Sequence, residues 1–269
     1  KCYHTFSDQK PTWNAPIGSY LPEWAWEIAN EKGLVITLHM VRDGAMADPE
    51  NQREIREMCT RYPHARLILA HAARGFHAPN TVKGISSLAG LQNVWFDMSG
   101  IDEPAPIAAV LREFGPRKLM WGTDFPVSET RGKVVTLGDG FLWLDFKTVD
   151  WEQSQHARPT LVGLESLRAL REAAHDFGLN AGDIADIFYH NAARLLGIET
   201  ESGTLTQDRY RYAKQRIPAG TQLLSKRPEI MAPDQWPAYA SQSHGCEVWD
   251  LDGRHYFDFT AAGIGACLL

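Results

Sequence analysis

The stretch Leu67-Ile68-Leu69-Ala70-His71 is an apolar run that stops at a histidine. Earlier in the chain, Val35-Ile36-Thr37-Leu38-His39 follows the same pattern and also ends in a histidine. Nearly continuous apolar runs are typical of strands that are covered on both faces, as in parallel sheets. The two runs therefore predict neighbouring strands inside a barrel or a covered sheet.

Further strands and helices alternate around these two runs. Residues 93–99 and 118–124 predict two more strands, and residues 1–6 predict the tail of an earlier one. Between the first two runs, residues 48–62 have a helical pattern that starts at an Asp-Pro pair. Such alternation is typical of a parallel sheet. We therefore expect an α/β fold, an incomplete (β/α)8 TIM-type barrel of about strands 4–8, because a closed barrel needs about eight units.

The second half of the chain is less regular. Residues 128–159 predict a long loop with several glycines and aromatic residues, either a lid over an active site or a surface excursion packed by its own side chains. Helices are expected at 161–177 and 183–196, and a polar run follows them. We predict three regions: a barrel domain at 1–200, a linker at 201–209 and a small truncated α+β segment at 210–269.

Composition narrows the class of protein. The formal net charge of −6 over 269 residues argues against a nucleic-acid binder. No apolar run is long enough to predict a membrane span, so a small-molecule substrate is the expected partner, with homo-oligomerisation left open. Four cysteines without metal-site or disulfide spacing indicate a reducing compartment, and we expect the cytoplasm. A start at Lys1 and an apolar end at 263–269 suggest that both ends are cut.

Three polar residues follow the predicted strands at matching positions. His39 and His71 end the two quoted runs, and Asp124 ends residues 118–124. Because loops at the carboxyl ends of parallel strands meet at one rim, we expect these side chains to lie together. Imidazole and carboxylate groups are ligands for a divalent ion such as zinc, and an aspartate beside a bound water can accept its proton.

A resemblance follows from these residues and their neighbours. Residues 1 to about 200 resemble the amidohydrolase-related family, through the strand-end histidines, Trp121-Gly122-Thr123-Asp124-Phe125-Pro126 and the helix at 191–197. The resemblance implies a metal-dependent barrel enzyme, a class that includes lactonases and decarboxylases. It makes His39, His71, Asp97 and Asp124 the ends of the fifth to eighth strands.

Site roles follow from this resemblance and from side-chain chemistry. His39 and Asp124 are the predicted ligands of zinc or manganese, and Asp124 and His71 are the predicted catalytic residues. The family's first strand supplies a His-x-His pair that this sequence lacks, so this chain alone is expected to bind metal weakly and to be inactive. Arg74 and Asp97 are the predicted substrate-binding residues, since a guanidinium holds a carboxylate through two donors; a solvent-exposed arginine is the competing reading.

The tail has a separate pattern. Residues 247–259 predict two short strands around the turn at Asp252 and Gly253. The last sixty or so residues resemble the N-terminal segment of class III aminotransferases, which include glutamate-1-semialdehyde aminomutase. That resemblance implies pyridoxal phosphate for a downstream domain, whose cofactor-binding residues are absent here.

Three hypotheses for function follow. The leading one is a hydrolase of the amidohydrolase or lactonase type that acts on a small carboxylate substrate, with a lyase or decarboxylase as its variant. The second is aminotransferase or aminomutase activity of the fused parent protein. The third is an inactive structural fragment of a barrel.

Overall fold

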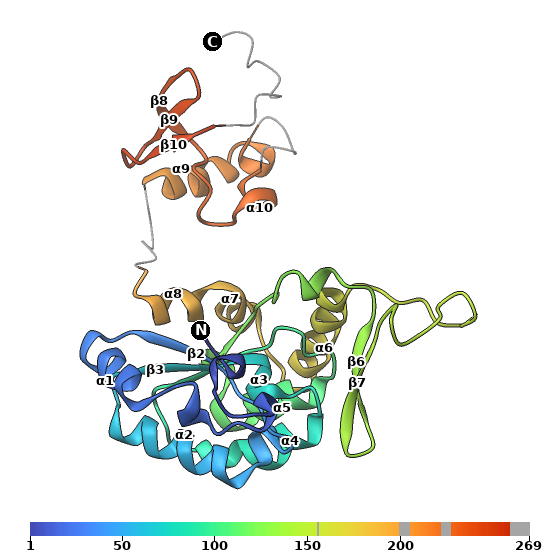
Figure 1. Ribbon diagram of the computed structural model, residues 1–269. Coiled ribbons are helices and arrows are strands. Elements are labelled where there is room, and N and C mark those ends of the chain that lie inside the picture. Colours follow the sequence, from blue (N-terminus) through green and yellow to red (C-terminus); the bar gives the residue numbers. More distant parts are fainter. Residues whose placement is uncertain (155, 199–204, 222–226, 259–269) are drawn as a thin grey trace. The chain divides into compact units, whose positions relative to one another are not determined.

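A computed structural model describes residues 1–154, 156–198, 205–221 and 227–258. The chain divides into two compact units, residues 1–199 and 200–269, each of which is described by itself (Figure 1). The predicted apolar end at 263–269 lies outside the described residues.

The first unit is built on a five-stranded parallel sheet. Its strands are adjacent in sequence order, each pairing with the next along the chain. They are β1 (Cys2–Tyr3), β2 (Val35–His39), β3 (Arg66–Leu69), β4 (Val94–Asp97) and β5 (Leu119–Met120). This order confirms the expected α/β fold, including the short strand at the start of the chain. Whether the parent barrel is incomplete stays a prediction.

Helices connect these strands and lie on the outer side of the sheet (Figure 1). Asp48 caps the second of them by accepting hydrogen bonds from two backbone amides, and Gly33 ends the first with a φ of 61°. The connecting helices are α1 (Glu23–Lys32), α2 (Pro49–Arg61), α4 (Ala78–Gly84) and α5 (Pro104–Phe114). The short segment α3 (Ala70–Arg74) is a left-handed turn at the carboxyl end of β3.

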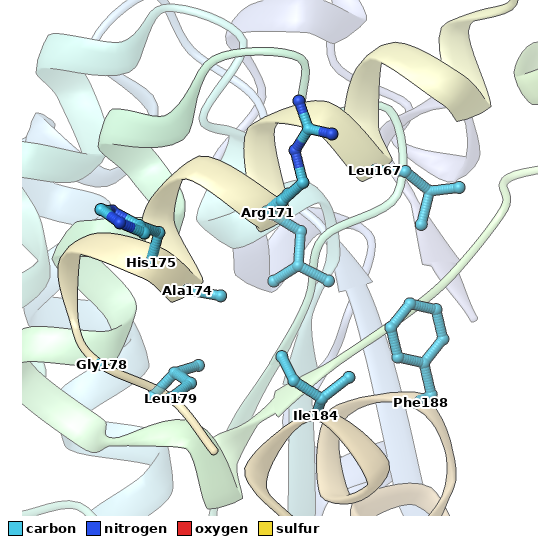
Figure 2. A pocket seen from close by; sticks show the side chains of 9 residues that line it. Leu167, Arg171, Ala174, His175, Gly178, Leu179, Ile184 and Phe188 are labelled. Carbon is cyan, nitrogen blue, oxygen red and sulfur yellow. The ribbon is translucent and has the colours of Figure 1, made fainter. Parts of the chain in front are cut away.

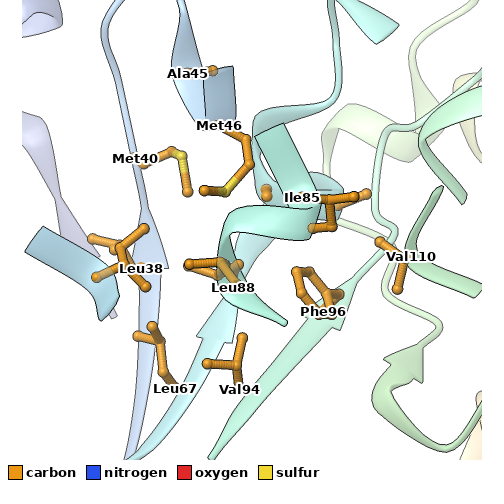
Figure 3. Packing of buried hydrophobic residues seen from close by; sticks show 14 of the residues in the cluster. Leu38, Met40, Ala45, Met46, Leu67, Ile85, Leu88, Val94, Phe96 and Val110 are labelled. Atoms are coloured by element: carbon orange, nitrogen blue, oxygen red, sulfur yellow. The ribbon is translucent and has the colours of Figure 1, made fainter. Parts of the chain in front are cut away.

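The core lies between the sheet and these helices. Side chains from β2, β3 and β4 meet residues from the loops and helices on the outer side, and most are fully buried (Figure 3). The residues labelled in the figure are Leu38, Met40, Ala45, Met46, Leu67, Ile85, Leu88, Val94, Phe96 and Val110. Burial of side chains of this size contributes roughly 1.5–3 kcal/mol each, which fixes the strands that carry the candidate site.

Several predicted elements differ from the structure, and the strand at 93–99 is only Val94–Asp97. The strand at 66–71 ends at Leu69, and the strand at 118–124 is only Leu119–Met120. The predicted long loop contains an antiparallel hairpin, β6 (Lys133–Leu137) and β7 (Gly140–Leu144). The helical part that follows is α6 (Val162–Asp176), α7 (Ala181–Ala185), a π-helical turn (Asp186–His190) and α8 (Asn191–Leu196).

In its described residues, 205–221 and 227–258, the second unit combines two α-helices with a three-stranded antiparallel sheet. The predicted hairpin around Asp252 and Gly253 is confirmed by the pairing of its two strands. The carboxylate of Asp252 also accepts from the amides of Leu205 and Thr206, and so caps a helix that begins inside the predicted linker. The elements are α9 (Leu205–Lys214), α10 (Pro228–Met231), β8 (Ala240–His244), β9 (Glu247–Asp250) and β10 (His255–Phe257). No helix in the described ranges is long and apolar enough to cross a membrane.

A buried carboxyl group, Asp102, joins the hairpin to α6. Its Oδ2 accepts from the Val134 amide at 2.8 Å, and its Oδ1 accepts from the Ser166 hydroxyl at 2.9 Å. Burial raises the pKa of Asp102 to about 7, with Glu165 nearby also raising it and Lys133 lowering it. The folded state therefore binds a proton more tightly than the unfolded state, where the carboxyl has its ordinary pKa near 3.8.

Asp102→Asn should change how stability depends on pH. Because the folded-state pKa is raised, Asp102 makes the folded protein less stable as pH rises from about 4 to about 7, by up to about 1.4 kcal/mol per pH unit. An amide keeps an acceptor for Val134 and a donor for Ser166 but never ionises. Urea unfolding followed by tryptophan fluorescence should show the decline in wild type and in the exposed control Asp8→Asn, but not in Asp102→Asn. Equal slopes in all three would contradict this assignment.

Candidate active site at the carboxyl edge of the sheet

The carboxyl ends of the five parallel strands meet at one edge of the sheet. His39 is the last residue of β2, Asp97 is the last of β4, and His71 follows β3 by two residues. The ring centroids of the two histidines are 5.0 Å apart, in an edge-to-face arrangement. The structure therefore brings His39, His71 and Asp97 together at this edge.

His39 is a buried and neutral imidazole. Its ring centroid lies 4.2 Å from that of Tyr3 at the end of β1, and its Nδ1 atom is buried without a hydrogen-bond partner. Burial lowers the pKa of His39 to about 3, and the positive charges of His71, Arg74, Lys1 and His4 lower it further. Near neutral pH this ring therefore presents unprotonated nitrogen.

His71 is oriented by the end of the neighbouring strand. Its Nδ1 donates to the backbone carbonyl of Ser99 at 2.8 Å and lies 3.1 Å from the Ser99 hydroxyl. The hydroxyl itself donates to Oδ1 of Asp97 at 2.5 Å. With its proton on Nδ1, the neutral ring has its free electron pair on Nε2, which can accept a proton.

The backbone at His71 has an uncommon conformation. Residues 71–74 all have positive φ, at 57°, 46°, 60° and 59°, and none of them is glycine. They form one left-handed turn, which is closed by a hydrogen bond from the Gly75 amide to the His71 carbonyl at 2.7 Å. Left-handed helical geometry costs roughly 1–2 kcal/mol per L-residue, so the surrounding structure must hold this turn in place. The expected continuation of the strand through His71 is wrong for this reason.

Asp97, a predicted substrate-binding residue, uses one of its oxygens within the protein. Its Oδ1 accepts from the backbone amides of His71 at 3.3 Å and Ser99 at 3.0 Å, in addition to the Ser99 hydroxyl. These bonds join the end of β4 to the start of the left-handed turn. Asp97 therefore contacts the residues that would act on a substrate.

Arg74 lies at the end of the left-handed turn and is half-buried. Its Cζ atom is 6.0 Å from the ring centroid of Phe76 and 5.9 Å from that of Phe141, and its Nη1 donates to the Met40 carbonyl at 3.4 Å. Within the described part of the chain, no carboxylate forms an ion pair with its guanidinium. Burial lowers the pKa of Arg74, because the partly desolvated position disfavours its charged form. The competing reading of Arg74 as a solvent-exposed side chain is wrong.

A cavity of about 580 Å³ adjoins Arg74. Residues from the loops after β1, β2 and β3 line it on one side, and the tip of the β6–β7 hairpin lines it on the other. The lining residues are Trp13, Arg42, Asp43, Ala45, Arg74, His77, Asn80, Asp139, Gly140 and Phe141. A volume of this size suits a small organic ligand.

The hairpin covers part of the site. The Phe76 ring centroid is 4.9 Å from His71, 5.4 Å from Phe141 and 5.5 Å from Trp143, so two hairpin side chains pack over the ring beside His71. The tip is also held by a contact of 3.3 Å between His77 Nε2 and the Gly138 carbonyl. Of the two readings of residues 128–159, the hairpin favours a cover over the site. The sequence reasoning missed Tyr3, Phe76 and Phe141 as site residues.

Asp124 also lies at the carboxyl edge of the sheet, but its charged neighbour is Lys1 and not one of the two histidines. It has a φ of 50°, and its Oδ1 is 3.7 Å from the Nζ atom of Lys1, which is 5.8 Å from the ring centroid of Tyr3. Lys1 and His4, which the sequence alone could not place, thus both lie beside the candidate site. Asp124 connects to His39 through Lys1 and Tyr3.

The described residues do not complete a site for a divalent ion. No group of three or more His, Cys, Asp and Glu side chains in those ranges is arranged to hold one. His39 and His71 offer two imidazoles, whereas a catalytic zinc takes about three protein ligands. The charges that act on His39 are positive, which also opposes a cation. The assignment of His39 and Asp124 as metal ligands stays a prediction.

A second hollow of about 570 Å³ lies between α6 and the helical segments that follow it (Figure 2). Its walls are mostly apolar, with Leu167, Leu179, Ile184 and Phe188 facing one another and His175 at its edge. It shares no residue with the cluster at the strand ends. We therefore place the candidate active site at the sheet edge and not in this hollow.

Comparison with known proteins assigns the first unit. A family model described as Amidohydrolase matches residues 10–198. L-fucono-1,5-lactonase from Burkholderia ambifaria is 28% identical over 122 residues, which cover 40% of this chain and 42% of that protein. The match thus spans about two fifths of the length of the curated relative.

Solved structures give weaker likenesses. A zinc-bound amidohydrolase from Burkholderia multivorans has a TM-score of 0.47 at 16% identity, covering 72% of this chain and 63% of that one. Amidohydrolase 2 from Bifidobacterium longum subsp. infantis has a TM-score of 0.39 at 19% identity, covering 66% and 55%. The family match over residues 10–198 covers well over half of the sequence, and the chain belongs to the amidohydrolase family.

Proposed function

We propose that this amidohydrolase hydrolyses a small substrate that carries a carboxylate, with a lactone as the leading class of reacting group. The observation that carries the proposal is Arg74, a half-buried guanidinium without an ion-pair partner among the described residues, beside a cavity and next to His71. A buried charge is costly unless something pairs with it. A substrate carboxylate supplies that partner through two parallel hydrogen bonds.

The cavity walls support a planar or partly apolar substrate. Phe141 and Trp13 line the cavity together with Arg74, and the Phe76 ring packs between Arg74 and His71. Apolar walls with a few placed polar groups are typical of small-molecule sites. In this arrangement Arg74 fixes the carboxylate end, and the reacting bond lies toward the strand ends.

Asp124 and His71 are the proposed catalytic residues. An ionised Asp124 accepts a proton from the attacking water, and Lys1 at 3.7 Å stabilises its negative charge. His71, with Nδ1 committed to the Ser99 carbonyl, presents the free electron pair of Nε2 to the reacting group. The proton that Asp124 takes from the water is returned to the ring oxygen, which leaves as the lactone C–O bond breaks. A divalent ion, when bound, would polarise the water or the carbonyl; zinc or manganese at His39 and Asp124 is part of the proposal for the whole protein.

The relative with a lactonase name supports hydrolysis of a cyclic ester over other reactions. Hydrolysis of a lactone releases a carboxylic acid, and the positive charges of Arg74 and Lys1 suit an anion in the product state as well. Decarboxylation, a lyase reaction, is the variant that the same carboxylate anchor would serve. Release of carbon dioxide without uptake of water distinguishes it.

Other expectations stay predictions. The family match ends at residue 198, so the aminotransferase resemblance of residues 210–269 and the pyridoxal phosphate of a downstream domain are proposals about the parent protein. The same holds for the domain boundaries, the cytoplasmic location, the small-molecule partner and the inactivity of this chain by itself. The inactive structural fragment is the outcome expected if no variant below changes turnover or binding.

Arg74→Lys tests the carboxylate anchor. Lysine keeps the charge but loses the paired donors, so we expect KM for a carboxylate-bearing lactone to rise about 10- to 100-fold with a smaller change in kcat. The measurement is acid release by the full-length parent protein in a pH-indicator assay, with L-fucono-1,5-lactone as the uncharged comparison substrate. Arg42→Lys is the matched control, because Arg42 lines the same cavity but already pairs with Asp48 and Glu50. An equal rise in KM for both variants would contradict the anchor.

Asp124→Asn tests proton transfer. The amide keeps the size of the side chain but cannot accept the proton, so kcat should fall by about 10²–10⁴-fold with little change in KM. The same assay measures it over a range of pH values. Glu129→Gln, a change of the same kind in the loop that follows, should leave kcat unaltered. Retention of wild-type kcat in Asp124→Asn would remove Asp124 from the mechanism.

The 269-residue chain should bind zinc weakly. His39, His71 and Asp124 are not arranged as a preformed set of zinc ligands, and Asp124 is paired with Lys1. The positive charges near His39 also oppose a cation. Metal analysis after dialysis against buffered zinc should give well below one ion per chain. His39→Ala, which removes one imidazole, should bind no more than wild type. Stoichiometric zinc retained by the wild-type chain would contradict this expectation.

A further inference from the structure

Asp97 contacts the first residue of the left-handed turn and also Ser99, which orients the His71 ring. We propose that Asp97 is a positioning residue, whose carboxylate holds the left-handed turn at 71–74 and thereby sets the His71 ring and the Arg74 guanidinium. The proposal rests on the proposed function for the roles of those two groups. It replaces the direct contact with substrate that the sequence predicts for Asp97.

The turn needs an external support because its own residues do not favour it. Glycine, asparagine and aspartate are the residues that adopt positive φ most readily. The turn consists of His71, Ala72, Ala73 and Arg74, and the two alanines are fully buried. Four successive residues of these types in the left-handed region therefore depend on contacts from outside the turn.

Asp97 supplies a contact at the first residue of the turn. The His71 amide donates to Asp97 Oδ1 at 3.3 Å, directly after the chain leaves β3. Later in the turn, the Thr81 hydroxyl donates to the Ala72 carbonyl at 2.8 Å. The carboxylate thus fixes the start of the turn, where the chain must change from extended to left-handed backbone, and a charged acceptor is stronger there than a neutral one.

The same oxygen also fixes the atom that orients the His71 ring. Ser99 donates to Asp97 Oδ1 through both its amide and its hydroxyl, at 3.0 and 2.5 Å. The carbonyl of Ser99 in turn accepts from Nδ1 of His71 at 2.8 Å. One carboxylate oxygen therefore sets the backbone of His71 and, through Ser99, the direction of its ring.

The end of β5 closes around this group. A side chain at Gly122 would place its Cβ 3.3 Å from Cβ of Ser99 and 3.6 Å from Oδ1 of Asp97, so glycine lets this segment approach closely. Asp124 follows two residues later. The packing leaves little room for Asp97 and Ser99 to take another position.

The consequence is that His71 and Arg74 should move together when Asp97 is changed. Arg74 is the last residue of the turn, and its guanidinium reaches the cavity from that position. Loss of the carboxylate lets residues 71–74 relax toward right-handed or extended backbone. The proton-transfer group and the carboxylate anchor then lose their positions in a single step.

Nuclear magnetic resonance on alanine- and histidine-labelled protein tests the backbone. Positive φ shortens the distance between an amide proton and its own Hα, so Ala72 and Ala73 should give strong intraresidue cross-peaks in wild type, with a protected Nδ1 proton on His71. Asp97→Ala should lose both signals, and Asp97→Asn should weaken them, because the amide accepts without the charge. Ser99→Ala removes only the hydroxyl and should keep them. Asp102→Asn, the matched control at a buried carboxyl that holds the hairpin, should also keep them.

Benzoate binding, followed by calorimetry, tests the consequence for Arg74. We expect Asp97→Asn to bind benzoate about 10- to 100-fold more weakly than wild type, with Asp102→Asn unchanged. A folded Asp97→Ala or Asp97→Asn protein that keeps the wild-type cross-peaks and Nδ1 proton overturns the proposal, as does wild-type affinity in a variant that has lost the turn. If Asp97→Ala does not fold, Asp97→Asn decides. If wild type binds no benzoate, the carboxylate site of the proposed function fails, and the resonance signals alone decide the role of Asp97.

Discussion

Parallel pairing across the sheet places Leu38 beside Leu69, Leu69 beside Phe96 and Phe96 beside Leu119, and all four side chains are fully buried. This row lies at or one residue before the ends of β2, β3, β4 and β5. His39 comes directly after Leu38, and Asp97 directly after Phe96. His71 comes two residues after Leu69. A shift of one residue in any pairing would send its apolar side chain to the opposite face, so the buried row fixes the register strongly. The geometry of the candidate site is a consequence of this packing.

Much of that geometry could be predicted, because it depends on patterns that the sequence carries directly. Apolar runs located β2 and β3, and Asp48 with Pro49 located the start of α2. The turn after β3 could not be predicted, since Ala72 and Ala73 have no local preference for positive φ and adopt it through contacts with distant residues. The β6–β7 hairpin did have a signal: two apolar runs separated by Gly138 and Asp139, a pair of residues typical of two-residue hairpin loops. The prediction of a long loop over residues 128–159 is therefore wrong for residues 133–144, which form this hairpin.

The charges around His39 favour an anionic ligand over a divalent cation. Lys1, Arg74, His4 and His71 all act on His39 in the same direction, and burial adds to their effect, so this ring stays neutral near physiological pH. The charges of Lys1 and Arg74 attract an anion and repel a divalent cation near His39, because both effects arise from the same positive charges. A metal site here needs further negative or neutral donors close to His39 and His71. A carboxylate substrate needs only the guanidinium that already lies beside the cavity.

Backbone strain and hydrogen bonding in the turn are linked through Asp97. If each left-handed residue costs roughly 1–2 kcal/mol, the four together approach the whole stability of a modest domain. Buried alanines at two of the positions limit steric conflict with the packed surroundings, and the closing bond to Gly75 and the bond from Thr81 offset part of the cost. In this conformation the same four residues aim His71 toward the Ser99 carbonyl and send Arg74 toward the cavity. The strain is therefore located where two separate chemical groups must be presented from one short segment, which is the situation in which strained backbone is expected to persist.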